Sequence, residues 1–274
     1  MTNRDLYFKY IDHDSPYINS TVIRAILAYV NDFESMGELL YMFEDDCKNP
    51  VLFDELMEKC ISGVPYQYVI HSAHFHMNNF YVDERVLIPR NETEELTEMV
   101  IELIYENKVE NGSLIDMCCG SGCIGLSLKK IFPNLKTTLL DVSSDALDVA
   151  KYNAERLECE CEFVQSDMFT NLNKKGFDIL VCNPPYIESE DTIDELVLNN
   201  EPKLALMAKP DTKFYEIVFQ NLLDYMNDEF IAAFEIGEDM TEKLTVLIEK
   251  YLPGIEYHFE KDLYGKQRFL FLVK

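Results

Sequence analysis

Residues 114–128, LIDMCCGSGCIGLSL, decide the fold of this chain. A short apolar run ends at Met117, and glycines follow at G-x-G-x-x-G spacing, at positions 120, 122 and 125. Glycines at this spacing allow a tight turn from a strand into a helix and the close approach of a ligand to the helix N-terminus. The stretch predicts a strand–loop–helix unit that binds a nucleotide-like ligand, but a turn whose glycines serve only packing has the same spacing.

Strand-like and helix-like segments alternate after this motif. Strand patterns occupy residues 137–142, 161–165 and 177–183, and a helical pattern at 145–157 separates the first two. Residues 214–274 add two helical patterns and about three strand patterns. Strands separated by helices of this length require right-handed crossovers. The sequence therefore predicts an α/β fold with a mostly parallel, doubly wound, Rossmann-like sheet.

The N-terminal part of the chain has a different pattern. Short amphipathic helical repeats without a phosphate loop predict a small helical domain over residues 1–64. Residues 65–90 are rich in β-branched and aromatic side chains, and they predict a linker with a β-hairpin that turns at Asn78-Asn79. A helix that begins at Asn91 opens the third region, so we expect the α/β domain to span residues 91–274.

Composition narrows the classes of partner. The chain has 274 residues with 24 Lys plus Arg against 50 Asp plus Glu. The formal net charge of −26 repels phosphate backbones and so disfavours nucleic-acid binding. Its 8 cysteines lack C-x-x-C spacing, so we expect reduced thiols and no metal site. The polar N-terminal stretch and the lack of a long apolar run predict a cytoplasmic protein that does not enter a membrane.

Polar side chains follow three later strands. Asp141 lies at the end of the strand pattern at 137–142, Asp167 follows the pattern at 161–165, and the tetrapeptide Asn183-Pro184-Pro185-Tyr186 ends the pattern at 177–183. Ligands bind at the carboxyl edge of a parallel sheet, where we expect these tips to meet. Asp141 could accept hydrogen bonds from ribose hydroxyls, and Asp167 could accept one from an adenine amine or could simply cap a turn. At this point both a nicotinamide dinucleotide and S-adenosylmethionine satisfy the pattern.

The tetrapeptide at 183–186 resembles the signature of methyltransferases that alkylate a planar amino nitrogen, namely the adenine-N6 and cytosine-N4 DNA enzymes and the protein-glutamine N5 enzymes. Further blocks are similar to the release-factor glutamine methyltransferases of the HemK/PrmC type, and they cover most of the chain. These blocks are residues 82–96, 114–128, 141–156, 201–206, 234–237 and 261–272.

This resemblance implies a class I methyltransferase fold and transfer of a methyl group from S-adenosyl-L-methionine, which leaves S-adenosyl-L-homocysteine. The implied acceptor is N5 of the glutamine in the Gly-Gly-Gln loop of peptide-chain release factors, and the N-terminal domain would help dock that protein. Alternatives are a ribosomal-protein glutamine and a DNA amino group. A catalytically silent protein that binds the donor and a nicotinamide dehydrogenase are further rivals.

The residue types in the tetrapeptide also indicate a chemical role, independently of the resemblance. An amide nitrogen is a poor nucleophile because its lone pair is delocalised, so the site must orient it. We expect the Asn183 side-chain oxygen and the Pro184 carbonyl to hold both hydrogens of the acceptor NH₂ group, while Pro185 stiffens the backbone and Tyr186 lies against the flat amide. Asn183, Pro184 and Tyr186 are thus predicted to be catalytic. All four residues are predicted to contact the substrate.

The resemblance also implies a set of cofactor-binding residues. Cys118 and Cys119 replace the glycine and the threonine or serine usual in the family, which we expect to affect cofactor affinity. Arg90 could border the methionine end of the pocket or could equally be a structural ion-pair partner. The predicted cofactor-binding residues are Cys118, Cys119, Gly120, Ser121, Gly122, Asp141, Val142, Asp167, Met168 and Asn183, and the predicted border residues are Arg90, Glu92 and Thr93.

Overall fold

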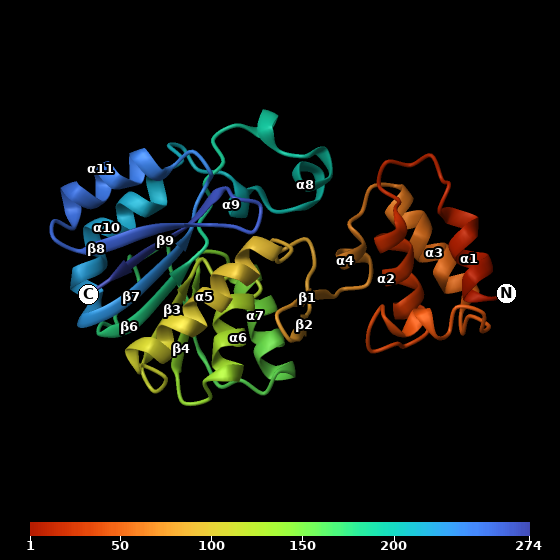
Figure 1. Ribbon diagram of the computed structural model, residues 1–274, viewed down its shortest axis with the longest axis horizontal. Coiled ribbons are helices and arrows are strands. Elements are labelled where there is room, and N and C mark those ends of the chain that lie inside the picture. Colours follow the sequence, from red (N-terminus) through yellow and green to blue (C-terminus); the bar gives the residue numbers. More distant parts are fainter. The chain divides into compact units, whose positions relative to one another are not determined.

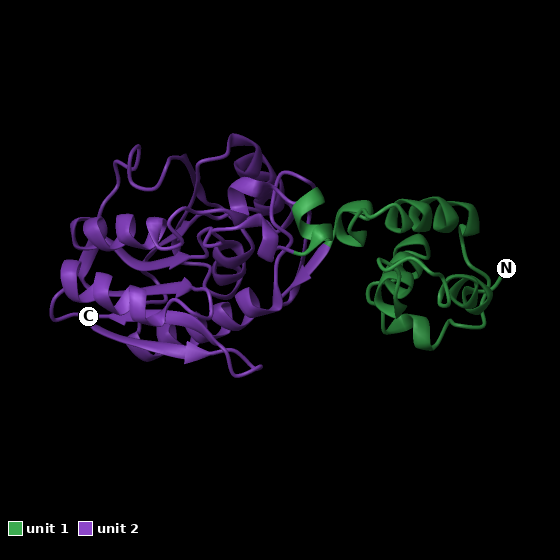
Figure 2. Ribbon diagram, turned by 90° about the horizontal axis from the view of Figure 1, so that it is seen from above, with its two compact units in different colours: residues 1–72, 194–200 green, residues 73–193, 201–274 purple.

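The structure is a computed structural model that describes all residues 1–274. The chain forms two compact units (Figure 2). The first consists of residues 1–72 together with 194–200, and the second consists of residues 73–193 and 201–274. The return of residues 194–200 to the first unit was not anticipated from the sequence.

The first unit is helical. Its longer helices have side-chain caps: the Asn19 side chain accepts hydrogen bonds at the start of α2, and the Asn49 side chain does so at the start of α3. Asn200 Nδ2 donates to the Gly63 carbonyl at 2.8 Å and so ties α8 to this unit. The helical segments are α1 (Asn3–Tyr10), α2 (Ser20–Val30), the 3₁₀ helix η1 (Glu38–Leu40), α3 (Pro50–Ile61), α4 (Tyr66–Val69) and α8 (Glu195–Asn200).

A short β-hairpin begins the second unit. Strands β1 (Ala73–Phe75) and β2 (Asn78–Phe80) pair antiparallel, with Phe75 opposite Asn78. The predicted turn at Asn78-Asn79 is therefore wrong: the chain turns at His76 and Met77. His76 takes the left-handed conformation with φ 54°, and its Nε2 lies 2.7 Å from a carboxylate oxygen of Glu98.

A seven-stranded sheet forms the centre of the second unit, in the order β5-β4-β3-β6-β7-β9-β8 (Figure 1). The pairs from β5 through β7 are all parallel. Strand β9 pairs antiparallel with β7 on one side and with β8 on the other. The predicted doubly wound α/β fold is confirmed. The strands are β3 (Ser113–Met117), β4 (Lys136–Asp141), β5 (Glu162–Gln165), β6 (Phe177–Cys182), β7 (Met226–Glu235), β8 (Glu256–Lys261) and β9 (Gln267–Val273).

Helices cover both faces of this sheet, because alternate strand residues are buried on opposite sides. Leu180 and its neighbours pack with α10 (Lys213–Tyr225) and α11 (Thr241–Tyr251). Ile179 packs with the other group, which is α5 (Asn91–Asn107), α6 (Cys123–Ile131) and α7 (Ser144–Arg156). Short segments η2 (Glu190–Thr192) and α9 (Lys203–Leu206) complete the second unit.

The strand order reverses beside β3. The chain moves outward from β3 to β4 and β5, and then returns to the other side of β3 as β6. The carboxyl ends of β3, β4 and β6 thus frame a switch point, which is where ligands bind in open α/β sheets.

Gly125 fixes how closely α6 approaches the sheet. A Cβ atom at this position would lie 2.4 Å from Leu139 Cδ2 and 2.9 Å from Asp116 Oδ2. We expect Gly125→Ala to lower the free energy of unfolding by about 1–3 kcal/mol, because the helix must move outward. Urea unfolding measures this change. Ser127→Ala is the matched control in the same helix, since its buried Oγ has no hydrogen-bond partner to lose.

Asp116 is a buried carboxyl group beneath the glycine loop. Its Oδ2 accepts a hydrogen bond from the Gly125 backbone N–H at 2.8 Å, whereas its Oδ1 has no partner. Burial raises the pKa of Asp116 from 3.8 to about 7; the Gly125 N–H opposes this shift and the nearby Asp141 adds to it. The folded state therefore binds more protons than the unfolded state between these two pKa values.

Stability should consequently fall as the pH rises through the folded-state pKa of Asp116. This group alone should cost roughly 2–3 kcal/mol of unfolding free energy between about pH 5 and about pH 8. Urea unfolding of the natural protein and of Asp116→Asn across this range tests the expectation. When the free energy of unfolding is plotted against pH, the curves of the two proteins should converge or cross, because the asparagine side chain does not titrate. Parallel curves would contradict this prediction.

Candidate active site

A pocket of about 990 Å³, including its opening to solvent, lies at the carboxyl edge of the parallel strands. Most of the predicted residues line it. Those in its wall are Arg90, Thr93, Cys118, Cys119, Gly120, Ser121, Asp141, Val142, Asp167, Met168, Asn183 and Pro185, and those outside it are Glu92, Gly122, Pro184 and Tyr186.

The loop after β3 contains three residues in the left-handed conformation: Cys118, Gly120 and Gly122, with φ values of 63°, 52° and 79°. A Cβ atom on Gly120 would meet no atom within 4 Å, so this glycine faces open space. A Cβ on Gly122 would lie 3.0 Å from Leu126 Cδ1 in α6. Gly122 therefore serves the turn and the packing of the helix, whereas Gly120 gives the loop an open surface toward the pocket.

Asp141 is held at the tip of β4 by two backbone donors. Its Oδ2 accepts from the Gly120 N–H at 2.9 Å and its Oδ1 accepts from the Ser143 N–H at 2.9 Å. Burial raises the pKa of Asp141, and the hydrogen bonds from Ser143 and Gly120 oppose that shift. Each carboxylate oxygen keeps acceptor capacity, so the group can bind two hydroxyl donors from a ligand.

The tip after β5 is stabilised by a serine. Ser166 Oγ donates to the Met168 carbonyl at 2.7 Å and accepts from the Asn171 N–H at 2.8 Å. The Asp167 carboxylate makes no hydrogen bond within the protein and is exposed in the pocket wall. The turn thus does not depend on a cap from Asp167, and this carboxylate is available to a ligand.

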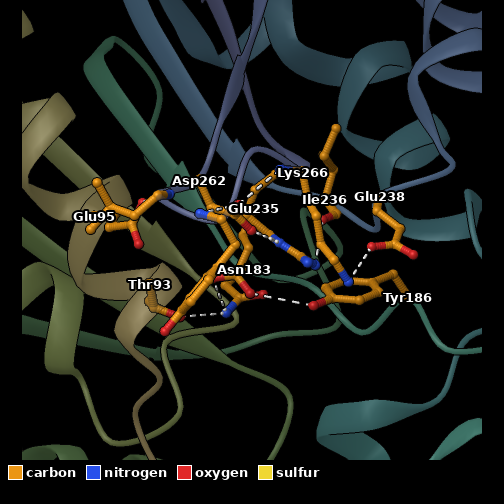
Figure 3. A network of polar contacts seen from close by, with 12 residues as sticks. Thr93, Glu95, Asn183, Tyr186, Glu235, Ile236, Glu238, Asp262 and Lys266 are labelled. Atoms are coloured by element: carbon orange, nitrogen blue, oxygen red, sulfur yellow. Dashed lines mark hydrogen bonds and ion pairs between the residues drawn. The ribbon is translucent and has the colours of Figure 1, made fainter.

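A polar network surrounds Asn183 (Figure 3). Asn183 Nδ2 donates to Glu235 Oε2 at 2.9 Å and to Thr93 Oγ1 at 3.1 Å. The Thr93 hydroxyl in turn donates to Glu235 Oε2 at 2.6 Å. Both N–H groups of the Asn183 amide are therefore used inside the protein. Its oxygen remains as an acceptor, next to a Pro184 carbonyl that also has no donor within the protein.

Tyr186 lies behind Asn183 rather than in the pocket wall. Its hydroxyl donates to Glu235 Oε1 at 3.3 Å, and its ring carbon Cδ2 would lie 3.5 Å from a Cβ on Gly237. Burial raises the pKa of Tyr186, and the negative charge of Glu235 adds to the shift, so the phenol stays protonated. The expected stacking of Tyr186 on a substrate amide is not what this geometry favours. The residue supports Glu235.

Glu235 is 4% exposed and lies at the end of β7. Burial raises its pKa, whereas the Thr93 hydroxyl, the charge of Arg268 and the Tyr186 hydroxyl oppose the shift and the charge of Glu92 adds to it. The sequence prediction assigned Glu235 no role. A single acidic residue in the apolar stretch FIAAFEIG was the available signal, since a carboxylate is buried only where donors surround it.

Arg90 lies in the pocket wall and forms the ion pair that the sequence left open. Its Nη2 is 2.6 Å from Glu201 Oε1, and Glu201 Oε2 accepts from the Ile88 N–H at 3.0 Å. Glu201 is buried, and the sequence prediction overlooked it because it lies 111 residues away along the chain. These contacts fix the backbone beside the pocket.

Two further properties concern the whole chain. The structure contains no group of three or more His, Cys, Asp or Glu side chains arranged to hold a metal ion. None of its helices combines the length and the apolar character needed to span a membrane.

The sequence of this chain is similar to known methyltransferases. Residues 89–209 match the family model of the methyltransferase small domain. A Streptococcus pneumoniae release factor glutamine methyltransferase is 38% identical over 218 residues, which cover 78% of this chain and 77% of that protein. A Bacillus subtilis release factor glutamine methyltransferase is 34% identical over 257 residues, which cover 86% of this chain and 89% of that protein.

Two other similarities are to methyltransferases whose names give other substrates. A Francisella tularensis ribosomal protein uL3 glutamine methyltransferase is 30% identical, with 86% of this chain and 76% of that protein covered. The structure of a T. thermophilus 16S rRNA N2 methyltransferase in complex with AdoMet and guanosine has a TM-score of 0.55 at 14% identity, with 74% of this chain and 49% of that chain covered. The second similarity concerns the fold alone. On the sequence relationships, the chain is a methyltransferase and belongs to the release factor glutamine methyltransferase family.

Proposed function

We propose that this protein transfers a methyl group from S-adenosyl-L-methionine to the side-chain nitrogen N5 of the glutamine in the Gly-Gly-Gln loop of peptide-chain release factors. The observation that carries the proposal is the Asn183 amide, whose two N–H groups are bonded inside the protein so that its oxygen is left as an acceptor. An acceptor fixed in this way suits the NH₂ group of a carboxamide. The first unit would help dock the release factor.

The residues of the pocket fit S-adenosylmethionine. Asp141 would accept hydrogen bonds from the two ribose hydroxyls, and Asp167 would accept one from the exocyclic adenine amine. Gly120 leaves room for the ligand, since a Cβ there would meet nothing within 4 Å. When bound, S-adenosylmethionine supplies a methyl group activated by a positively charged sulfur. The product S-adenosylhomocysteine would occupy the same contacts.

The role of the Asn183-Pro184 acceptors is to position the nucleophile. The Asn183 oxygen and the Pro184 carbonyl would accept one hydrogen each from the substrate NH₂ group and hold its nitrogen toward the methyl donor. The same two oxygens stabilise the positive charge that develops on this nitrogen, so the proton can leave after transfer without a strong base. Pro185 would border the substrate, and Tyr186 would act through Glu235.

A glutamine of a ribosomal protein is the second candidate substrate, because a uL3 glutamine methyltransferase is among the relatives. The acceptor group is the same carboxamide, so the site chemistry does not separate the two. DNA is a weaker candidate, since a net charge of −26 repels it.

Mass spectrometry tests the substrate directly. The protein is incubated with labelled S-adenosylmethionine and, in parallel, with a release factor, ribosomal protein uL3 or duplex DNA. We expect one added methyl group on the loop glutamine of the release factor. A release factor whose loop glutamine is changed to glutamate is the control and should stay unlabelled. Label in DNA or uL3 without label in the release factor would overturn the proposal.

A further inference from the structure

We infer that Glu235 is a positioning residue that decides which end of the substrate carboxamide faces the methyl donor. The inference rests on the proposed function, because it concerns the same acceptor group. It follows from the way in which Glu235 holds Asn183 in one of its two possible orientations.

An asparagine amide has two ends of nearly equal size, and only its partners determine which end points outward. Glu235 Oε2 accepts from Asn183 Nδ2 at 2.9 Å, and Oε1 accepts from the Tyr186 hydroxyl, so both oxygens of this side chain act as acceptors. Thr93 gives its hydroxyl proton to the same Oε2, so it too presents only a lone pair to Asn183. Both partners therefore require the nitrogen of Asn183 to point inward and the oxygen to point outward.

Without Glu235 this preference disappears. The Thr93 hydroxyl would be free to donate to Asn183 Oδ1 instead, and the amide could rotate by half a turn. Thr93 alone is compatible with either orientation, because a hydroxyl both donates and accepts. Tyr186 cannot restore the preference, since its hydroxyl bonds to Glu235 and not to Asn183.

The substrate carboxamide has the same two-ended character. With the Asn183 oxygen outward, the site binds the NH₂ end, which carries the nucleophilic nitrogen. With the Asn183 nitrogen outward, the site would instead bind the carbonyl end and turn the nitrogen away from the donor. Both modes form a hydrogen bond to Asn183, and only the reversed mode lacks the bond to the Pro184 carbonyl, so the loss of Glu235 should lower kcat more than it raises KM.

The orientation depends on an acceptor at position 235 and not on its charge. A glutamine there could place its oxygen toward Asn183 and Thr93 and its NH₂ group toward the Tyr186 oxygen. Glu235→Gln should thus retain kcat within about tenfold, whereas Glu235→Met, which is similar in length but has no acceptor oxygen, should reduce kcat about a hundredfold. The dissociation constant of S-adenosylmethionine should remain within about threefold in both variants.

Two measurements on the full chain test this inference. The first is the pair kcat and KM for a release factor in the natural protein, Glu235→Gln and Glu235→Met, with calorimetry of S-adenosylmethionine as the check on cofactor binding. The second is NMR of the Asn183 side-chain NH₂ group, assigned by its loss in Asn183→Asp. Its two protons should show hydrogen-bonded shifts and slow solvent exchange in the natural protein and in Glu235→Gln, and should lose both properties in Glu235→Met.

The outcomes separate this inference from the proposed function. If the natural protein methylates no release factor, the proposed function fails, yet the NMR comparison still decides whether Glu235 holds Asn183. Equal losses of kcat in Glu235→Gln and Glu235→Met, or a rise of KM at constant kcat, would overturn the inference. Should Glu235→Met not fold, Glu235→Gln and Thr93→Val provide the test. The hydrogen-bonded NH₂ signal of Asn183 should persist in both variants, because each keeps an acceptor at position 235. Loss of this signal in either variant would overturn the inference.

Discussion

Asn183→Ala is expected to reduce kcat for glutamine methylation by about 10²- to 10³-fold. The substitution removes the acceptor oxygen that would position the nucleophile and stabilise its developing charge. It does not touch Asp141 or the glycine loop, so the dissociation constant of S-adenosylmethionine should change by less than about tenfold. Single-turnover kinetics with a release factor and calorimetry with the cofactor measure the two quantities separately.

The matched control for this prediction is Asn134→Ala. Asn134 is also an asparagine whose Nδ2 makes a hydrogen bond, at 2.9 Å to Asn111, but it is exposed and lies just before β4, at the opposite edge of the sheet. Its kcat should equal that of the natural protein. A rate close to the natural one in Asn183→Ala would remove Asn183 from the reaction.

Asp141→Ala is expected to weaken binding of S-adenosylmethionine by about 10²- to 10⁴-fold. Hydrogen bonds to a charged group contribute about 1.5–3 kcal/mol each, and the ribose would lose two of them. The Gly120 and Ser143 N–H groups would also lose their acceptor, which loosens the loop that frames the pocket. Calorimetry with the cofactor measures the loss of affinity without requiring any protein substrate.

Asp145→Ala provides the control for Asp141→Ala. It removes the same charge four residues later, at an exposed position in the first turn of α7 and outside the pocket wall. Its cofactor affinity should be unchanged. Because burial raises the pKa of Asp141, acidification should weaken the affinity of the natural protein at a higher pH than it would for a carboxyl group of ordinary pKa. An unchanged affinity in Asp141→Ala would rule out ribose binding by this carboxylate.

The features that were predictable from the sequence depend on local patterns. Apolar periodicity predicted the strands and helices of the sheet, and the spacing of Gly120, Gly122 and Gly125 predicted the loop at its carboxyl edge. The tip residues Asp141, Asp167 and Asn183 were also identified from sequence, because each lies at or just after the end of a predicted strand. In each case a few neighbouring residues contain the whole signal.

The features that were missed depend on partners far away in the chain. The contacts of Asn183 with Glu235 span 52 residues and those of Arg90 with Glu201 span 111, and no periodicity encodes such pairs. The position of Tyr186 follows from Glu235, so its predicted contact with the substrate could not be judged without that pairing. The hairpin turn was misplaced because the tendency of asparagine to form turns was weighed without the register, which pairs Asn78 with Phe75.

The return of α8 to the first unit has a practical consequence for dissecting the protein. A fragment that begins at residue 73 would still carry α8, with its half-buried Leu196, Val197 and Leu198, but without the rest of the unit to which this helix belongs. Asn200 would also lose its bond to Gly63. Removal of the N-terminal residues alone is therefore expected to yield an aggregation-prone polypeptide, and a soluble minimal enzyme would require a short polar bridge in place of residues 194–200.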